Sequence, residues 1–249
     1  MAPRSKLIST YARIGRAYWR WAPSLMLLAL VVFIPLGLVH AATVHAEIGS
    51  IGLTAGFKLI AAIAAVLALA ATGLIGEVFY AGAVSILLTH PRKDGQPPSL
   101  REIAGMINYS RLIAVDLIYG ALVAVGLVFL VVPGVLAFVW LGLAAPVVEI
   151  ERRGIRAGFA RSVRLVRGRF WLVALVLIPI ELVGDSLTGL LTSATHHLFA
   201  SELLGEWVAD ILANVAFTPF YAVAAVLLTV DLIREKGGDT ELHSKPSTK

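Results

Sequence analysis

Six long apolar runs, separated by short polar connectors, constrain the fold of this chain more than any other feature. Their approximate limits are 25–43, 62–88, 112–132, 135–150, 170–191 and 211–232. Most of them approach the roughly 20 residues that a helix needs to cross a bilayer. Hydrophobic residues make up 58% of the chain and charged residues 15%, against about 45–50% and about 25% in a soluble domain. The sequence therefore predicts an all-α, polytopic membrane bundle of six transmembrane helices within residues 1–234.

The second apolar run is too long for one straight span. It extends from Leu59 to Leu88, which is 30 residues. A longer run must tilt or break to fit the hydrocarbon layer. The connector that follows it contains Ser99 and, three residues later, Glu102. This is a capping-box pattern, so we expect a helix to start there and lead into the third span.

The distribution of basic residues decides the number of spans and their orientation. Only Val132-Pro133-Gly134 interrupts the block formed by the third and fourth runs, and proline followed by glycine suits a tight turn between helices. With a turn there, every lysine and arginine except Lys58 falls on one side of the membrane. Cytoplasmic connectors are enriched in these residues. We therefore expect a protein of the bacterial-type inner (plasma) membrane, with both termini in the cytoplasm.

The residues before the first span predict an amphipathic helix at the membrane interface. One helical face collects the apolar residues Leu7, Tyr11, Ile14, Tyr18 and Trp21. Basic residues occupy the opposite face, as in helices that lie in the headgroup region. We expect this helix to stay attached to an uncleaved first span. At the other end, the polar segment 235–249 is expected to be a disordered cytoplasmic tail.

The connector between the fourth and fifth spans contains seven arginines. Its apolar residues share one face at helical spacing, namely Ile155, Phe159, Val163, Val166 and Phe170. We therefore expect a second interfacial helix whose arginines contact anionic headgroups or a phosphate, at about 1 kcal/mol per basic residue. The candidate contacts are Arg152, Arg153, Arg156, Arg161, Arg164 and Arg167. The alternative is that these arginines only set the orientation of the chain.

The residues around this connector also occur in a familiar order. They are Pro133-Gly134, Pro146 with Glu149, Ala157, Arg161-Ser162, Leu165, Gly168 and Trp171. In this the chain resembles the glycerophosphoryl diester phosphodiesterase membrane-domain family, and it is similar to related uncharacterised inner-membrane proteins of the YciC type. Pro219 and Asp231-Leu232-Ile233-Arg234 resemble that family's closing helix, although Thr229-Val230 stand where aromatic residues are usual. The resemblance implies a six-helix module. It implies no phosphodiesterase activity here, since the His-Arg pair of the catalytic barrel is absent from this sequence.

Carboxylates inside the apolar runs form a second candidate site. Glu77 falls near the middle of the second run, and Glu181 lies midway along the fifth with Asp185 one turn further on the same face. A carboxylate at the bilayer centre costs about 2.5–3.5 kcal/mol on insertion scales, so each must face protein, water or a ligand. We expect a polar cavity for protons, cations or a cationic group. The alternative is structural hydrogen bonding between helices.

The sequence contains no catalytic signature. It has no cysteine, which excludes disulfides and thiolate chemistry, and the Ser-x-x-Lys, Gly-x-Ser-x-Gly and Gly-Lys-Ser/Thr motifs do not occur. We expect no enzyme, no cofactor and no metal site, and no binding to nucleic acid. The expected function is a non-catalytic membrane module that engages anionic lipid, a partner membrane protein or a second copy through its arginine-rich helix. The alternative is a small transporter or channel component that uses the intramembrane carboxylates.

Overall fold

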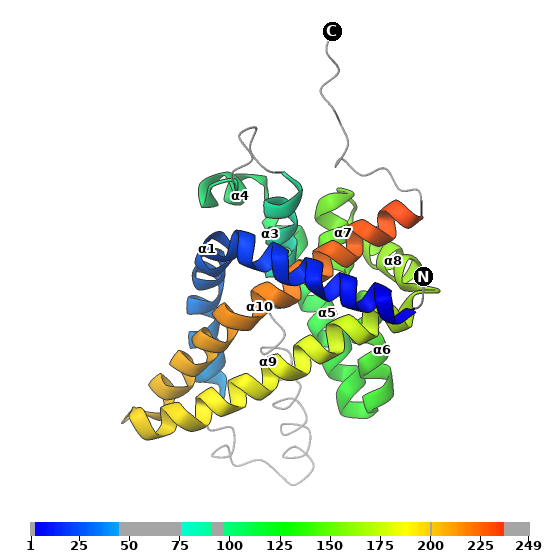
Figure 1. Ribbon diagram of the computed structural model, residues 1–249. Coiled ribbons are helices and arrows are strands. Elements are labelled where there is room, and N and C mark those ends of the chain that lie inside the picture. Colours follow the sequence, from blue (N-terminus) through cyan, green and yellow to red (C-terminus); the bar gives the residue numbers. More distant parts are fainter. Residues whose placement is uncertain (1–2, 45–75, 91–96, 200, 237–249) are drawn as a thin grey trace.

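The computed structural model describes residues 3–44, 76–90, 97–199 and 201–236 (Figure 1). Its helices are α1 (Pro3–Val44), α3 (Glu77–Thr89), α4 (Leu100–Met106), α5 (Tyr109–Phe129), α6 (Val131–Leu141), α7 (Ala144–Ile150), α8 (Ile155–Val166), α9 (Phe170–Leu198) and α10 (Glu202–Glu235). No strand occurs in the described ranges. Five helical stretches are long and apolar enough to cross a membrane: Leu7–Leu38, Tyr109–Phe129, Val131–Ile150, Phe170–Thr195 and Glu202–Glu235. The predicted membrane helical bundle is therefore confirmed.

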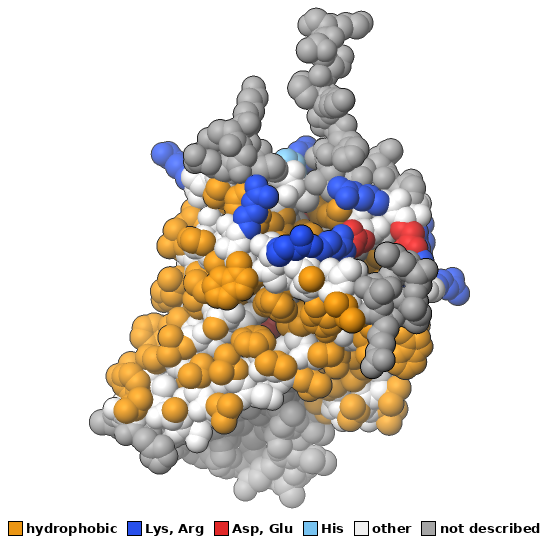
Figure 2. Space-filling model, viewed as in Figure 1, with side chains coloured by type: hydrophobic (Ala, Val, Ile, Leu, Met, Phe, Trp, Pro, Cys, Tyr) orange, Lys and Arg blue, Asp and Glu red, His pale blue; other side chains and the backbone are white. Residues whose placement is uncertain are grey.

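The surface has one basic end and a large apolar area. In Figure 2 the lysine and arginine side chains gather towards one end of the visible face, and hydrophobic side chains cover most of the rest. Large apolar residues of the long helices point outward; Leu117, Leu122 and Leu182 are 50%, 48% and 60% exposed. Such a surface suits the hydrocarbon of a bilayer better than water.

α10 is the central helix of the bundle. It contacts α1, α3 and α9, and residues 221–226 are buried in succession. A helix that is apolar all round is buried on all sides. α9 runs antiparallel beside α10 (Figure 1). Residues of α10 therefore form one wall of any cavity inside this half of the bundle.

α1 is a single helix of 42 residues, where an interfacial helix and a separate first span at 25–43 were expected. In Figure 1 its N-terminal half runs across the bundle, and the helix then turns to follow α10. Pro23 and Pro35 lie inside it. Proline removes a backbone hydrogen bond and is the usual cause of such a bend.

The apolar face of this N-terminal half packs on protein rather than on lipid. Ile14 is fully buried. The hydroxyl of Tyr11 donates a 2.7 Å hydrogen bond to the carbonyl oxygen of Leu175 in α9. The face expected at the membrane interface is therefore covered, because α9 and α10 supply an apolar surface for it.

The second apolar run is interrupted at Gly76. This residue has φ +100°, and α3 begins immediately after it. The expected span at 62–88 is thus not one continuous helix, and α3 has only 13 residues. Residues 62–75 lie outside the described ranges, as does most of the predicted tail at 235–249.

The expected hairpin between the third and fourth spans exists, but its turn is not at Pro133-Gly134. The chain reverses at Leu130, which has extended backbone with φ −157°, and both residues lie in the first turn of α6. A proline is tolerated there because the first backbone N–H groups of a helix have no intrahelical acceptor. The two helices approach closely at Gly126, where an added Cβ would lie 2.7 Å from the Cα of Gly134.

α4 begins at the predicted capping box. The Ser99 hydroxyl accepts from the backbone N–H of Glu102 at 3.3 Å, and the Glu102 carboxylate accepts from the backbone N–H of Ser99 at 2.7 Å. The helix does not lead into the third span as expected. It ends at Met106, and α5 starts anew with Asn108 as its N-cap.

Candidate functional site

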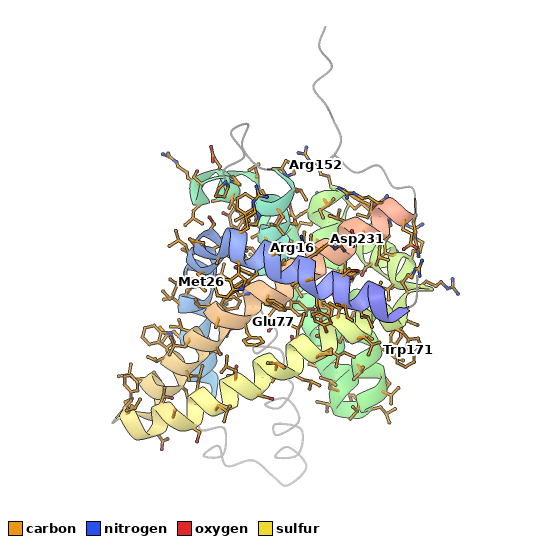
Figure 3. All side chains as sticks on the ribbon, in the orientation of Figure 1. Arg16, Met26, Glu77, Arg152, Trp171 and Asp231 are labelled. Atoms are coloured by element: carbon orange, nitrogen blue, oxygen red, sulfur yellow. The ribbon has the colours of Figure 1, made fainter. Side chains whose placement is uncertain are left out.

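The three carboxylates predicted as an intramembrane site line one cavity. Glu77 of α3 meets Glu181 and Asp185 of α9 around a space of about 40 Å³, which has room for roughly two or three water molecules. Asp185 is exposed, whereas Glu77 and Glu181 are partly buried. The cavity therefore opens to the surface beside Asp185. Figure 3 labels Glu77 between the ribbons of α1, α9 and α10.

The break before α3 positions Glu77. The backbone N–H of Gly76 donates to the carboxylate of Asp116 in α5 at 2.6 Å. A Cβ on Gly76 would lie 2.5 Å from Leu36 Cδ1 and 3.1 Å from Phe33 Cε1. Only glycine combines this left-handed backbone with such close contacts at low cost. Glu77 thus enters the bundle from a helix N-terminus held by Asp116.

α10 adds a polar side to the cavity that the sequence analysis missed. Asn214, Thr218 and Tyr221 are among the lining residues. The Thr218 hydroxyl donates to Asn214 Oδ1 at 2.9 Å, and the Asn214 amide donates to Asp210 Oδ1 at 3.1 Å. Asp210, Asn214 and Thr218 recur every four residues inside an apolar span, so they share one face. That spacing is the signal that would have found them.

One polar atom at the cavity wall lacks a hydrogen bond within the described residues. Glu77 Oε2 is buried and has no such partner. The hydroxyl of Tyr221, a residue only 2% exposed, interacts with Tyr119. Buried polar groups are usually paired with protein or with an ordered water. The free oxygen of Glu77 therefore provides unused hydrogen-bonding capacity inside the bundle.

The electrostatic environment of the cavity is acidic. Its described lining residues include three carboxylates and no lysine or arginine. Four carboxylates interact with a charge on Glu77, those of Asp116, Glu181, Asp185 and Asp210. Neighbouring carboxylate charges raise the free energy of the charged cavity. A bound cation would lower that free energy. The arrangement is suited to a cation, a proton or an ammonium group.

An apolar groove adjoins this cavity. It has a volume of about 420 Å³. Its walls come from α1, α9 and α10, and they are Tyr11, Tyr18, Trp19, Pro179, Ile180, Val183, Ala216, Phe217 and Phe220. Ile180 and Phe217 also line the carboxylate cavity. Figure 2 shows an acidic side chain deep in a hollow of the apolar face.

The arginine-rich connector forms the expected helix, α8, and its buried side overlaps the predicted apolar face, because Val166 is buried and Ile155 and Phe159 pack against the core. Gly158, Ser162, Leu165 and Val166 are buried. The Ser162 hydroxyl donates to the Trp140 carbonyl oxygen at 2.7 Å. Helix α8 therefore docks on α6 and α7 rather than lying on lipid alone.

Two of the six candidate arginines are held by one acid. Glu151 is 4% exposed in its side chain. Arg161 donates to it from Nη2 at 2.9 Å and from Nε at 3.1 Å, and Arg153 pairs with the same carboxylate. Arg161, with a side chain 15% exposed, is thus a structural residue in this fold, whereas the side chain of Arg153 stays 39% exposed. Charge counting could not reveal this difference.

The other four candidates, Arg152, Arg156, Arg164 and Arg167, are exposed. Arg152 also lines a cavity of about 290 Å³ at the basic end, together with His90, Asn108, Arg111 and Glu149. The two arginines outnumber the single glutamate. This cavity is therefore a candidate place for an anionic headgroup.

Comparisons with known proteins assign no family to this chain. No family model matches the sequence, and no solved structure matches the chain. The resemblance to the glycerophosphoryl diester phosphodiesterase membrane-domain family stays a prediction. Within the described residues, histidine and acidic side chains form no group of three or more that could hold a metal ion.

Proposed function

We propose that this integral membrane protein binds an ammonium group in its carboxylate cavity, as a small transporter or a component of one. The observation behind the proposal is the convergence of Glu77, Glu181 and Asp185 from two helices on one cavity that opens to the surface. Structural hydrogen bonding alone would favour closed, paired acids. Here a buried carboxylate oxygen of Glu77 is left without a partner among the described residues.

Binding of methylammonium to the full-length protein in phosphatidylcholine nanodiscs tests this proposal. Isothermal titration calorimetry should detect binding to the wild-type protein and a loss of at least about tenfold in affinity for E181Q/D185N, equivalent to about 1.4 kcal/mol. The matched control is Glu202→Gln, because Glu202 is an exposed acid in the first turn of α10 outside the cavity. Equal binding by the wild-type protein and E181Q/D185N, or no binding by either, would overturn the proposal.

A second function is proposed for the basic end, namely contact with anionic lipid of the cytoplasmic leaflet. It is supported by the exposure of Arg156 and Arg164 on α8 and of Arg167 at its C-cap. We also propose that both termini lie on the same side of the membrane. We expect the protein to have no catalytic activity. Native mass spectrometry should show fewer retained phosphatidylglycerol molecules for R156Q/R164Q/R167Q than for the wild-type protein. An unchanged number of retained phosphatidylglycerol molecules would mean that these arginines only set the orientation of the chain in the membrane.

A further inference from the structure

The apolar groove beside the carboxylate cavity is walled mainly by hydrocarbon and aromatic surface. The ring centroids of Tyr18 and Trp19 lie 5.6 Å apart and those of Tyr18 and Phe220 5.7 Å apart, both edge to face. Trp19 is 76% exposed. At about 420 Å³, the groove falls in the range of ordinary ligand pockets.

The tyrosine hydroxyls of the groove are already used. Tyr11 donates to the carbonyl oxygen of Leu175 at 2.7 Å, and Tyr18 donates to that of Ala216 at 3.2 Å. These bonds hold α1 across α9 and α10. They also leave the rings, rather than the hydroxyls, to contact a ligand, so the groove selects an alkyl chain.

The carboxylate cavity, which adjoins the groove, is polar and acidic. On α9, Ile180 and Val183 face the groove, whereas Glu181 and Asp185 face the cavity. Ile180 belongs to both linings, as does Phe217 of α10. A molecule lying across these two residues would therefore place its two ends in an apolar and in an acidic environment.

We propose that the groove and the cavity form one site for an amphipathic amine, with the alkyl chain in the groove and the ammonium group between Glu181 and Asp185. This inference rests on the proposed function, since it takes the cavity as the cation site and adds the substrate class. Charge complementarity favours this occupant over a neutral or anionic amphiphile. The exposed rim at Trp19 and Asp185 allows such a molecule to enter sideways from the bilayer.

Photolabelling of the full-length protein in phosphatidylcholine nanodiscs tests the inference. The probe is a dodecyl chain with a primary amine at one end and a diazirine at the other, and the matched probe has a hydroxyl in place of the amine. The amine probe should label the α1, α9 and α10 segments that line the groove about tenfold more than the alcohol, the ratio that 1.4 kcal/mol of charge pairing produces. In E181Q/D185N the two probes should label equally.

A variant of the groove separates this inference from the proposed function. Ala216 is exposed and lines only the groove, so A216W should fill it without disturbing the core. We expect A216W to lose labelling by the amine probe and to keep methylammonium binding. If the wild-type protein binds methylammonium but both probes label the groove equally, the groove is ordinary lipid-facing surface and the inference is wrong. If methylammonium does not bind at all, the proposed function fails first.

Discussion

The backbone N–H of Gly76 donates a 2.6 Å hydrogen bond to the carboxylate of Asp116. This contact joins the start of α3 to α5 and fixes where Glu77 enters the bundle. It also satisfies one of the N–H groups that a helix N-terminus leaves without an intrahelical acceptor. One interaction thus links the break in the second apolar run to the geometry of the carboxylate cavity.

Replacing Gly76 with alanine should destabilise the protein by about 1–3 kcal/mol, the usual cost of a strained backbone conformation. The residue has φ +100°, and the new Cβ would lie 2.5 Å from Leu36 Cδ1. A lower melting temperature in detergent is the measurement. Gly189→Ala is the control, because Gly189 has open space around its Cβ position. An unchanged melting temperature for G76A would show that the break before α3 is not constrained as described.

Filling the cavity should abolish cation binding without unfolding the bundle. Gly184 lines the cavity, and the nearest neighbour of an added Cβ is Phe217 Cδ1 at 3.5 Å, an ordinary contact. The extra carbons of Gly184→Leu would therefore occupy the cavity itself. Methylammonium titration should show no binding, while circular dichroism stays unchanged. Gly189→Leu, on the same helix but away from the cavity, should bind methylammonium as the wild-type protein does. Full binding by G184L would mean that the cation site is not in this cavity.

Glu151 and Arg161 should behave as a coupled pair. Their side chains are 4% and 15% exposed, and removing one partner of a buried ion pair costs about 3–5 kcal/mol. Glu151→Gln and Arg161→Gln should each lower the free energy of unfolding, and the double variant should cost less than the sum of the two. Arg156→Gln, at an exposed position, should have a small effect. Additive losses would mean that the pair makes no energetic contribution.

The docking of α8 should depend on the absence of a side chain at Gly158. An added Cβ would lie 2.3 Å from Val148 Cγ2 of α7, and overpacking of this kind costs about 1–3 kcal/mol. Gly158→Val should loosen α8, which trypsin would report as faster cleavage after Arg156 and Arg164. Ala157→Val serves as the control, since Ala157 is exposed. Equal cleavage of the two variants would argue against docking through this face.

Hydropathy and charge were sufficient to predict the class of fold, because both reflect solvation of the whole chain. They also identified Glu77, Glu181 and Asp185, because an acidic residue within an apolar run can be recognised without knowing which face of the helix it occupies. The turn at Leu130 was missed because Pro133-Gly134 is the stronger local turn signal. In the structure Pro133-Gly134 lies inside α6, where Gly134 packs closely against Gly126. The pairing of Arg161 with Glu151 is likewise a tertiary contact that no local pattern reports.

The packing of α1 also has a consequence for how the protein is made. Arg13 pairs with Asp231, a residue 218 positions later, and Tyr18 bonds to the backbone of Ala216. The N-terminal half of α1 therefore leaves the ribosome long before its partner helices exist. Its contacts with Asp231 and Ala216 can form only after the chain has been made as far as α10. The N-terminal half of α1 thus acquires these contacts late, although it precedes α10 in the sequence.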